Sequence, residues 1–170
     1  PPRNWDCPGT GRGGRHYGGS LTAMGLAQES AVLKAGVDFP GVHDWSAFLP
    51  AWEDTAKDAP DLKDAIDLAR KSSPVAAIAT WKSPVLLLHG DDDRNVPFAQ
   101  DTDLTQRLRK QGVRFEEIIY PDELHGFLLW RDWVRSYRAS QAFFDGQPTY
   151  QPPRLILQGN RAVPSHLGCH

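Results

Sequence analysis

Hydrophobic positions along the middle of the chain follow a helical period in some segments and a strand period in others. Four segments have apolar residues at helical spacing, which predicts helices over residues 20–34, 61–71, 98–112 and 129–144. Three short, mainly apolar runs separate them, which predicts strands over residues 35–39, 84–90 and 113–120. Strands joined through single helices form right-handed crossovers, so this order predicts an α/β fold, a parallel sheet with helices on both faces.

The spacing also predicts which side chains face the core. In the first helix the apolar positions are Leu21, Met24, Ala27 and Ala31. The last helix has a stripe typical of a helix packed on a sheet: Trp130, Trp133, Val134, Tyr137 and Phe144. The run PVLLLHG at residues 84–90 is continuously apolar before its final His-Gly, which indicates a strand buried on both faces.

The two ends of the chain lack this alternation of helix and strand patterns. Residues 1–12 have no hydrophobic period, and residues 147–170 are rich in proline with one apolar triplet, LIL. We therefore expect one domain over residues 13–146, flanked by two segments that do not share its pattern. No apolar run precedes residue 13, so no strand is expected there.

Composition and charge narrow the classes of function. The 170 residues suffice for one domain, and 40% of them are hydrophobic and 24% charged. The net charge of −2 gives no indication of a basic surface for nucleic acid, and no apolar run has the roughly 20 residues of a membrane span. We therefore expect neither nucleic acid nor a membrane as a partner. Cys7 and Cys169 lie near opposite ends, and His166, Cys169 and His170 have the spacing of a polar tail rather than a metal site.

Candidate chemistry lies near the ends of the predicted strands. Residues 14–18, GRHYG, have the outline of the G-x-S-x-G nucleophile elbow, with His16 in place of the serine. Strand 84–90 runs into the acidic loop DDDRNVP, and strand 113–120 runs into PDELHGF. Reactive groups collect beyond the carboxyl ends of such strands, and the order elbow, Asp, His is that of α/β-hydrolase triads. There the Asp fixes the tautomer of the His, whose other nitrogen acts as base.

Four stretches carry a resemblance to a known family: YGGSLTAMGLAQES, KAGVDFPGVHDW, SPVLLLHGDDDRNVPFAQ and YPDELHGF. On them, residues 13 to about 146 resemble the C-terminal part of the catalytic domain of the prolyl oligopeptidase family of serine peptidases, and its dipeptidyl and acylaminoacyl peptidase branches in particular. The resemblance implies an α/β-hydrolase-type sheet, hydrolysis of peptide bonds by a Ser-Asp-His mechanism, and no cofactor.

The family's motifs imply roles for individual residues. The H-G-x-x-D-x-x-V loop implies that Asp93 is the triad acid, and DELHGF implies that His125 is the triad base. His16 falls on the nucleophile position. Tyr17 follows it, and its backbone N–H is implied as one oxyanion donor.

Three further residues match positions that contact substrate in the family. The resemblance implies that Asn95 holds a substrate carbonyl and that Val42 and Trp45 line the first specificity pocket. No metal is expected. The loop DDDRNVP fails as a calcium loop because its sixth position is Val96 rather than Gly and its twelfth is Thr102 rather than Glu.

Two departures from the family bear on activity. An imidazole differs from a hydroxymethyl group in length, so His125 is not expected to activate His16, while Ser20 lies one helical turn further on and is expected to pack against the helix. The early strands of the family's sheet, and the second oxyanion donor that they carry, are not recognisable. The domain is therefore expected to be truncated, with an exposed sheet edge that favours self-association.

These observations lead to one expected function and two alternatives. We expect a serine-type peptidase scaffold for a peptide or small acyl substrate, whose turnover is impaired by His16. One alternative is a small-ester hydrolase, because fold and triad alone do not choose the acyl group. The other is a catalytically silent scaffold or interaction module that keeps the fold without the chemistry.

Overall fold

Four parallel strands form the central sheet in a computed structural model that describes residues 10–48, 60–147, 155–158 and 161–164. In chain order and in sheet order they are β1 (Thr10–Gly14), β2 (Leu33–Asp38), β3 (Val85–Gly90) and β4 (Phe115–Tyr120). The parallel sheet that the sequence predicts is confirmed. A separate antiparallel pair follows in the C-terminal segment, β5 (Leu155–Gln158) and β6 (Arg161–Pro164).

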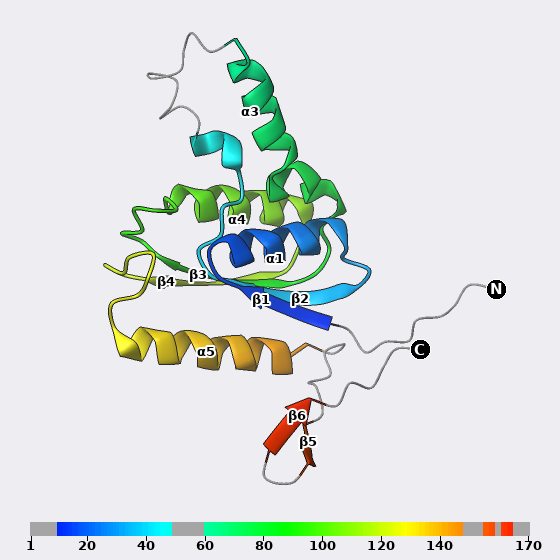
Figure 1. Cartoon of the computed structure of the whole chain (residues 1–170), viewed down its shortest axis with the longest axis vertical. Helices are drawn as coiled ribbons and strands as arrows, with labels where there is room; N and C mark the ends of the chain where they lie inside the picture. Colours follow the sequence, from blue (N-terminus) through cyan, green and yellow to red (C-terminus); the bar gives the residue numbers. More distant parts are fainter. Residues whose placement is uncertain (1–9, 49–59, 148–154, 159–160, 165–170) are drawn as a thin grey trace, which may run out of the picture.

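Helices cover both faces of the sheet, as predicted (Figure 1). The α-helices are α1 (Tyr17–Gln28), α3 (Leu62–Lys71), α4 (Ala99–Gln111) and α5 (Trp130–Asp145), and the 3₁₀ turns are η1 (Trp45–Phe48) and η2 (Pro74–Thr80). Helices α1 and α4 lie on one face and α5 on the other. None of the described helices combines the length and the apolar character needed to cross a membrane.

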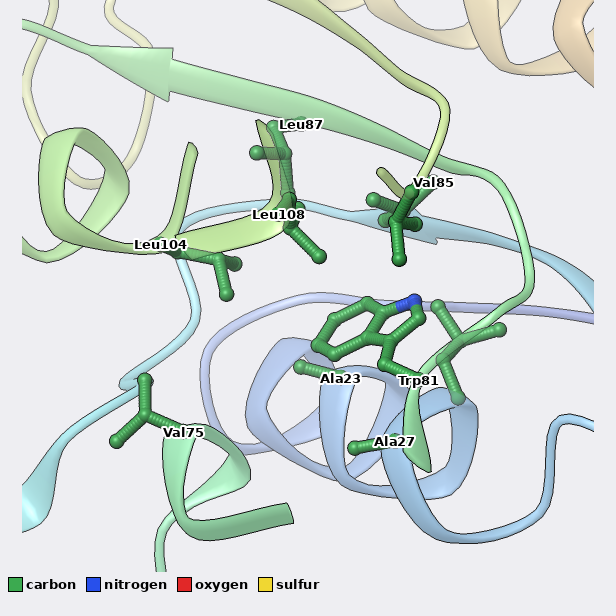
Figure 2. Close-up of a cluster of buried hydrophobic side chains, with 10 residues drawn as sticks. Ala23, Ala27, Val75, Trp81, Val85, Leu87, Leu104 and Leu108 are labelled. Atoms are coloured by element: carbon green, nitrogen blue, oxygen red, sulfur yellow. The ribbon is translucent and has the colours of Figure 1, made fainter. Parts of the chain in front are cut away.

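Strand β3 lies at the centre of the core, and all six of its residues are buried. Val85 and Leu87 pack with α1, η2 and α4 around the wholly buried Trp81 (Figure 2). Leu86 and Leu88 point to the opposite face and pack with α5. The predicted strand buried on both faces is confirmed, because each face of β3 is covered by helices.

A strand does precede the elbow, and here the expectation from the sequence is wrong. Strand β1 begins at Thr10, inside the segment 1–12, and pairs in parallel with β2. Its sequence TGRGG contains no apolar side chain, and its residues are exposed or half-buried. The strand therefore rests on backbone pairing to β2 rather than on side-chain burial, which leaves no hydrophobic pattern to detect.

The first helix also differs from its prediction. It ends at Gln28, and Leu33 and Lys34, which the spacing places in the helix, belong to β2. Of the predicted core positions only Ala27 is buried, while Leu21 is 39% exposed. The buried face is made mostly of small residues: Gly19, Ser20, Thr22, Ala23, Leu26 and Ala27. Small residues let α1 approach the sheet closely, and hydrophobicity alone does not mark them.

The predicted stripe on the last helix is only partly correct. Trp130 and Tyr137 are 77% and 60% exposed. The buried face of α5 instead contains Ser136 and Phe143. Ser136 Oγ is hydrogen-bonded to the hydroxyl of Tyr120 at 2.7 Å, which satisfies both polar groups where they are buried. A paired serine therefore occupies a core position that lies outside the predicted stripe.

Candidate active site

The turn between β1 and α1 has the backbone geometry of a nucleophile elbow, with His16 at its apex. His16 adopts φ 56° and ψ −122°. A residue other than glycine at positive φ is uncommon, and the structure around it must compensate for the strain. Glycine is required at position 14, because a Cβ there would overlap the backbone of Gly18 across the turn. The strand, sharp turn and helix lift the side chain at position 16 above the carboxyl ends of the strands.

Asp93 lies in the loop after β3, where the sequence places the acid. Its side chain is buried, and Oδ1 accepts hydrogen bonds from the backbone N–H groups of Asn95 (2.8 Å) and Val96 (2.9 Å). These bonds form an Asx turn, which fixes the carboxylate relative to its own loop. The other carboxylate oxygen of Asp93, Oδ2, faces the loop after β4.

His125 lies in the loop after β4 and connects Asp93 to the elbow. Its Nδ1 is 2.6 Å from Asp93 Oδ2, and both side chains are buried. Its Nε2 is in hydrogen-bond contact with Nδ1 of His16. The three side chains form a line from a buried carboxylate, through an imidazole, to the exposed apex of the elbow. The structure therefore brings together the three residues that the sequence selected as acid, base and nucleophile position.

Two residues that the sequence analysis missed hold these loops together. The Arg15 guanidinium donates to the backbone carbonyl of His125 at 3.2 Å and lies over the ring of Trp133. The buried Glu123 carboxylate accepts from the backbone N–H groups of Leu128 and Leu129 and so closes the loop that carries His125. No periodic signal marks either residue, since Arg15 lies in a turn and the Glu123 carboxylate bonds to backbone N–H groups.

The electrostatic surroundings keep the imidazole at the elbow neutral. The pKa of His16 is lowered from its ordinary value, first by desolvation and then by the charges of His125 and Arg15, while Asp93 opposes the shift. At neutral pH, His16 is therefore an uncharged ring against His125.

Tyr17 and Asn95 lie beside this line of side chains, and their roles remain predictions. Tyr17 is the first residue of α1, so its backbone N–H is among those with no acceptor inside the helix, as an oxyanion donor requires. Asn95 is exposed in the Asp93 loop, and the contact that involves it is its backbone N–H to Asp93.

The specificity pocket predicted around Val42 and Trp45 also remains a prediction. Val42 is buried at 7% exposure, while Trp45 is half-buried with its ring 6.4 Å from that of Tyr17. A nearby cavity of about 260 Å³ is lined by neither of them; its lining is Asp44, Ala47, Pro97, Ala99, Gln100, Asp103 and Arg107. The ring of Trp45 does stand beside the residue that follows the elbow apex.

Ser20 does not take the place of the missing nucleophile. Its side chain is buried at 4% exposure, and its Oγ accepts from the backbone N–H of Val42 at 2.8 Å. The same hydroxyl lies 3.5 Å from the carbonyl of His16. Ser20 is therefore not at the apex of the elbow, as expected, and its hydroxyl joins α1 to the segment after β2.

Behind Asp93 lies a buried network of alternating imidazoles and carboxylates that the sequence analysis did not find. His89 Nε2 is 3.4 Å from Asp93 Oδ2, and His89 Nδ1 is 3.3 Å from Asp101 Oδ1. Further in, His43 Nε2 is 2.7 Å from Asp38 Oδ2, and His43 Nδ1 is 3.9 Å from Asp101 Oδ1. Strands β2 and β3, the segments that follow them and helix α4 bring these side chains together.

The carboxylates of this network raise the proton affinity of its imidazoles. Burial alone would lower the pKa of His43, but its hydrogen-bonded partner Asp38, together with Asp101, raises it above its ordinary value. Burial would likewise lower the pKa of His89, but Asp101, the Val96 carbonyl and Asp93 together raise it.

These shifts predict that the protein loses stability as pH rises above neutrality. A histidine whose pKa is higher in the folded than in the unfolded state stabilises the fold fully below about pH 6.5. This contribution is lost as pH rises through the raised pKa values of His43 and His89, by up to about 1.4 kcal/mol per pH unit for each proton. Urea unfolding between pH 6 and pH 9 measures the slope. A free energy of unfolding that rises with pH over this range would contradict the expectation.

No group of three or more metal-ligating side chains gathers in the part of the chain that the structure describes. The tail residues His166, Cys169 and His170, and likewise Cys7, lie outside the described residues.

Comparison with known proteins agrees with the geometry of the site. The model of the prolyl oligopeptidase family matches residues 10–148, which include β1, the elbow and both loops. The chain belongs to the prolyl oligopeptidase family. The family match begins at the strand that the hydrophobic pattern fails to reveal.

Members of the prolyl oligopeptidase family with assigned activities are similar over most of the domain. Dipeptidyl peptidase 4 of Sus scrofa is 33% identical over 114 residues, which cover 66% of this chain and 15% of that protein. Venom dipeptidyl peptidase 4 of Vespula vulgaris is 31% identical over 127 residues, which cover 71% and 16%. The chain thus spans about one sixth of the length of these curated relatives.

Solved structures of the prolyl oligopeptidase family share the fold. An acylaminoacyl peptidase in complex with Z-Gly-Gly-Phe-chloromethyl ketone superposes with a TM-score of 0.72 and 25% identity, covering 88% of this chain and 25% of that one. A puromycin-hydrolyzing peptidase of Mycobacterium tuberculosis gives a TM-score of 0.70 and 26% identity, covering 84% and 23%. The sheet is therefore the α/β-hydrolase-type sheet that the sequence predicts.

Proposed function

We propose that this chain carries the acid and base of a serine-peptidase site, Asp93 and His125, and that His16 at the nucleophile position leaves it without serine-peptidase turnover. The observation that carries the proposal is the line Asp93–His125–His16, with the last residue at positive φ on the turn between β1 and α1. Membership of a peptidase family supports the reaction class, and the substrate class is a peptide or small acyl compound.

The geometry of the pair suits the work of a triad. Asp93 Oδ2 accepts from His125 Nδ1, which fixes the tautomer and leaves Nε2 free to take a proton. The carboxylate would also stabilise the imidazolium that forms when a nucleophile loses its proton to His125. A hydroxyl at the elbow within reach of Nε2 would complete the line of acid, base and nucleophile.

His16 cannot supply that hydroxyl. Its ring meets His125 edge-on with centroids 3.7 Å apart, so an imidazole nitrogen occupies the position where a serine Oγ would hydrogen-bond. A proton can pass between the two rings, but no stable acyl-enzyme ester can form without a hydroxyl. Any residual hydrolysis would come from binding and water attack alone.

A fluorophosphonate probe tests this proposal, because it labels only an activated serine. The chain as it stands is expected to remain unlabelled, and the His16→Ser chain is expected to be labelled at position 16. The double variant His16→Ser/His125→Ala is the matched control and should again resist labelling, since the base is gone. The label is located by mass spectrometry of tryptic peptides.

Two outcomes would count against the proposal. Labelling of the unmodified chain at a serine would show that the nucleophile lies elsewhere. Rapid hydrolysis of chromogenic dipeptides by the unmodified chain, abolished by His125→Ala, would show that His16 supports turnover. Hydrolysis of p-nitrophenyl acetate without hydrolysis of dipeptides by the His16→Ser chain would favour the small-ester hydrolase instead.

We also propose that the chain self-associates through β1. Among the described residues, strand β1 is at one edge of the four-stranded sheet and no strand pairs with its outer side, and an unpaired edge favours pairing with another chain. Sedimentation velocity at increasing concentration is expected to show species larger than a monomer. Thr10→Lys, which places a charge on this edge, should reduce them, whereas Thr102→Lys on the exposed surface of α4 should not. A purely monomeric profile at all concentrations would refute the proposal.

A further inference from the structure

His89 occupies a position in which it can control the Asp93 carboxylate. It is the fifth residue of β3 and is wholly buried, so its ring is held by the centre of the core. Its Nε2 is 3.0 Å from the carbonyl of Val96 and 3.4 Å from Asp93 Oδ2. One imidazole thus contacts both the carboxylate and the turn that carries it.

The opposite side of the same ring is held by a second carboxylate. Asp101 lies in the first turn of α4 at 2% exposure, and its Oδ1 is 3.3 Å from His89 Nδ1. Within the described residues neither His89 Nδ1 nor Asp101 Oδ2 has a hydrogen-bond partner, so the charge contact with Asp101 Oδ1 is what compensates His89 Nδ1. Without Asp101, the Nδ1 of His89 would be buried with no polar partner, and without His89 the Asp101 carboxylate would be a buried charge with no counter-charge. The pair therefore constrains the orientation of the His89 ring.

Charge balance explains why such a pair suits this place. The raised pKa values of His89 and His43 favour the charged imidazoles, which offset the buried carboxylates of Asp101 and Asp38 beside them.

We propose that His89, anchored by Asp101, is a positioning residue that holds the Asp93 carboxylate in line with His125. The inference rests on the proposed function of the Asp93–His125 pair. With Oδ1 fixed by the backbone of its own loop and Oδ2 flanked by His89, the carboxylate has one orientation, and in it Oδ2 accepts from His125 Nδ1. His89 itself is 0% exposed, so it acts on the site through Asp93.

The readout for this inference is the proton between His125 and Asp93, observed by proton NMR on the chain as it stands. A hydrogen bond between imidazole and carboxylate in a buried site gives a low-field resonance, which His125→Ala would assign by its disappearance. We expect His89→Asn and Asp101→Asn to broaden or remove this resonance while the near-ultraviolet circular dichroism of the fold persists. Asp103→Asn is the matched control, because Asp103 lies on the same helix but pairs with Arg107 at the surface.

Where His89→Asn fails to fold, Asp101→Asn decides, since it keeps the size of the side chain and removes only the charge. An unchanged low-field resonance in folded Asp101→Asn would overturn the inference and assign the network a purely structural role. Absence of the resonance from the unmodified chain would also overturn it, because Asp93 would not be held in line.

An activity measurement separates this inference from the proposed function. In the His16→Ser chain, His89→Asn or Asp101→Asn is expected to lower kcat about 10²-fold with little change in KM, as misplacement of a reacting group does. If the resonance responds but the His16→Ser chain neither hydrolyses nor labels, the proposed function fails and the positioning role stands. If the His16→Ser chain is active and neither variant changes kcat or the resonance, the positioning role fails alone.

Discussion

Asp93→Asn is expected to lower hydrolysis of a chromogenic dipeptide by the His16→Ser chain about 10⁴-fold in kcat. The carboxylate accepts from His125 Nδ1, and that bond leaves Nε2 unprotonated toward the elbow. An asparagine amide can donate to Nδ1 instead, which places the ring proton on Nε2. The base then faces the nucleophile in the wrong tautomer, although the geometry is nearly unchanged.

The neighbouring Asp92 provides the control for this prediction. Asp92 is exposed and pairs with Arg94 at 3.0 Å on the surface of the same loop. Asp92→Asn should leave kcat of the His16→Ser chain within a few-fold of its starting value, because surface pairs contribute little. Equal losses in both variants would mean that the loop as a whole, rather than the Asp93 carboxylate, supports activity.

Topology places the loops that carry Asp93 and His125 at one edge of the sheet, and the family's H-G-x-x-D-x-x-V and DELHGF motifs select these two residues within the loops. A continuous apolar run must be a buried strand, and the loop after its carboxyl end must lie at the edge where the other strands end. The two loops therefore had to meet, and the 2.6 Å contact between their side chains results from that meeting. His16 was found through the glycines around it. One of them, Gly14, lies so close to the backbone of Gly18 that a Cβ there would overlap it.

The elements that sequence reasoning missed are those stabilised without a hydrophobic pattern. Strand β1 pairs through its backbone, and the inner face of α1 is built from small residues that hydrophobic spacing does not mark. The network behind Asp93 was missed for a different reason. Its members lie up to 63 residues apart, Asp38 on β2 and Asp101 on α4, so only the folded sheet brings them together. The sequence offered one indication of this network, a histidine near the end of the buried strand β3, His89.

His43→Leu is expected to lower the free energy of unfolding by about 3–5 kcal/mol at pH 8. The substitution replaces the imidazole with an apolar side chain of similar size and leaves the Asp38 carboxyl, which is 2% exposed, without its 2.7 Å partner. A buried charge without a partner costs far more than the pair contributes, and total stabilities of domains are about 5–15 kcal/mol. Burial raises the pKa of Asp38, so its protonation in acid should reduce the loss.

Chemical denaturation at pH 5 and pH 8 measures both the size and the sign of this effect. A carboxyl with a raised pKa in the folded state loses its contribution as pH rises through that value, so the loss in His43→Leu should be larger at pH 8 than at pH 5. Adding Asp38→Asn, which removes the charge, should recover part of the stability at pH 8. Lys63→Ala breaks a fully exposed ion pair with Asp67 and should change stability little at either pH. A loss in His43→Leu that is equal at both pH values and not recovered by Asp38→Asn would show that packing around His43, and not the charge of Asp38, determines the stability of this part of the sheet.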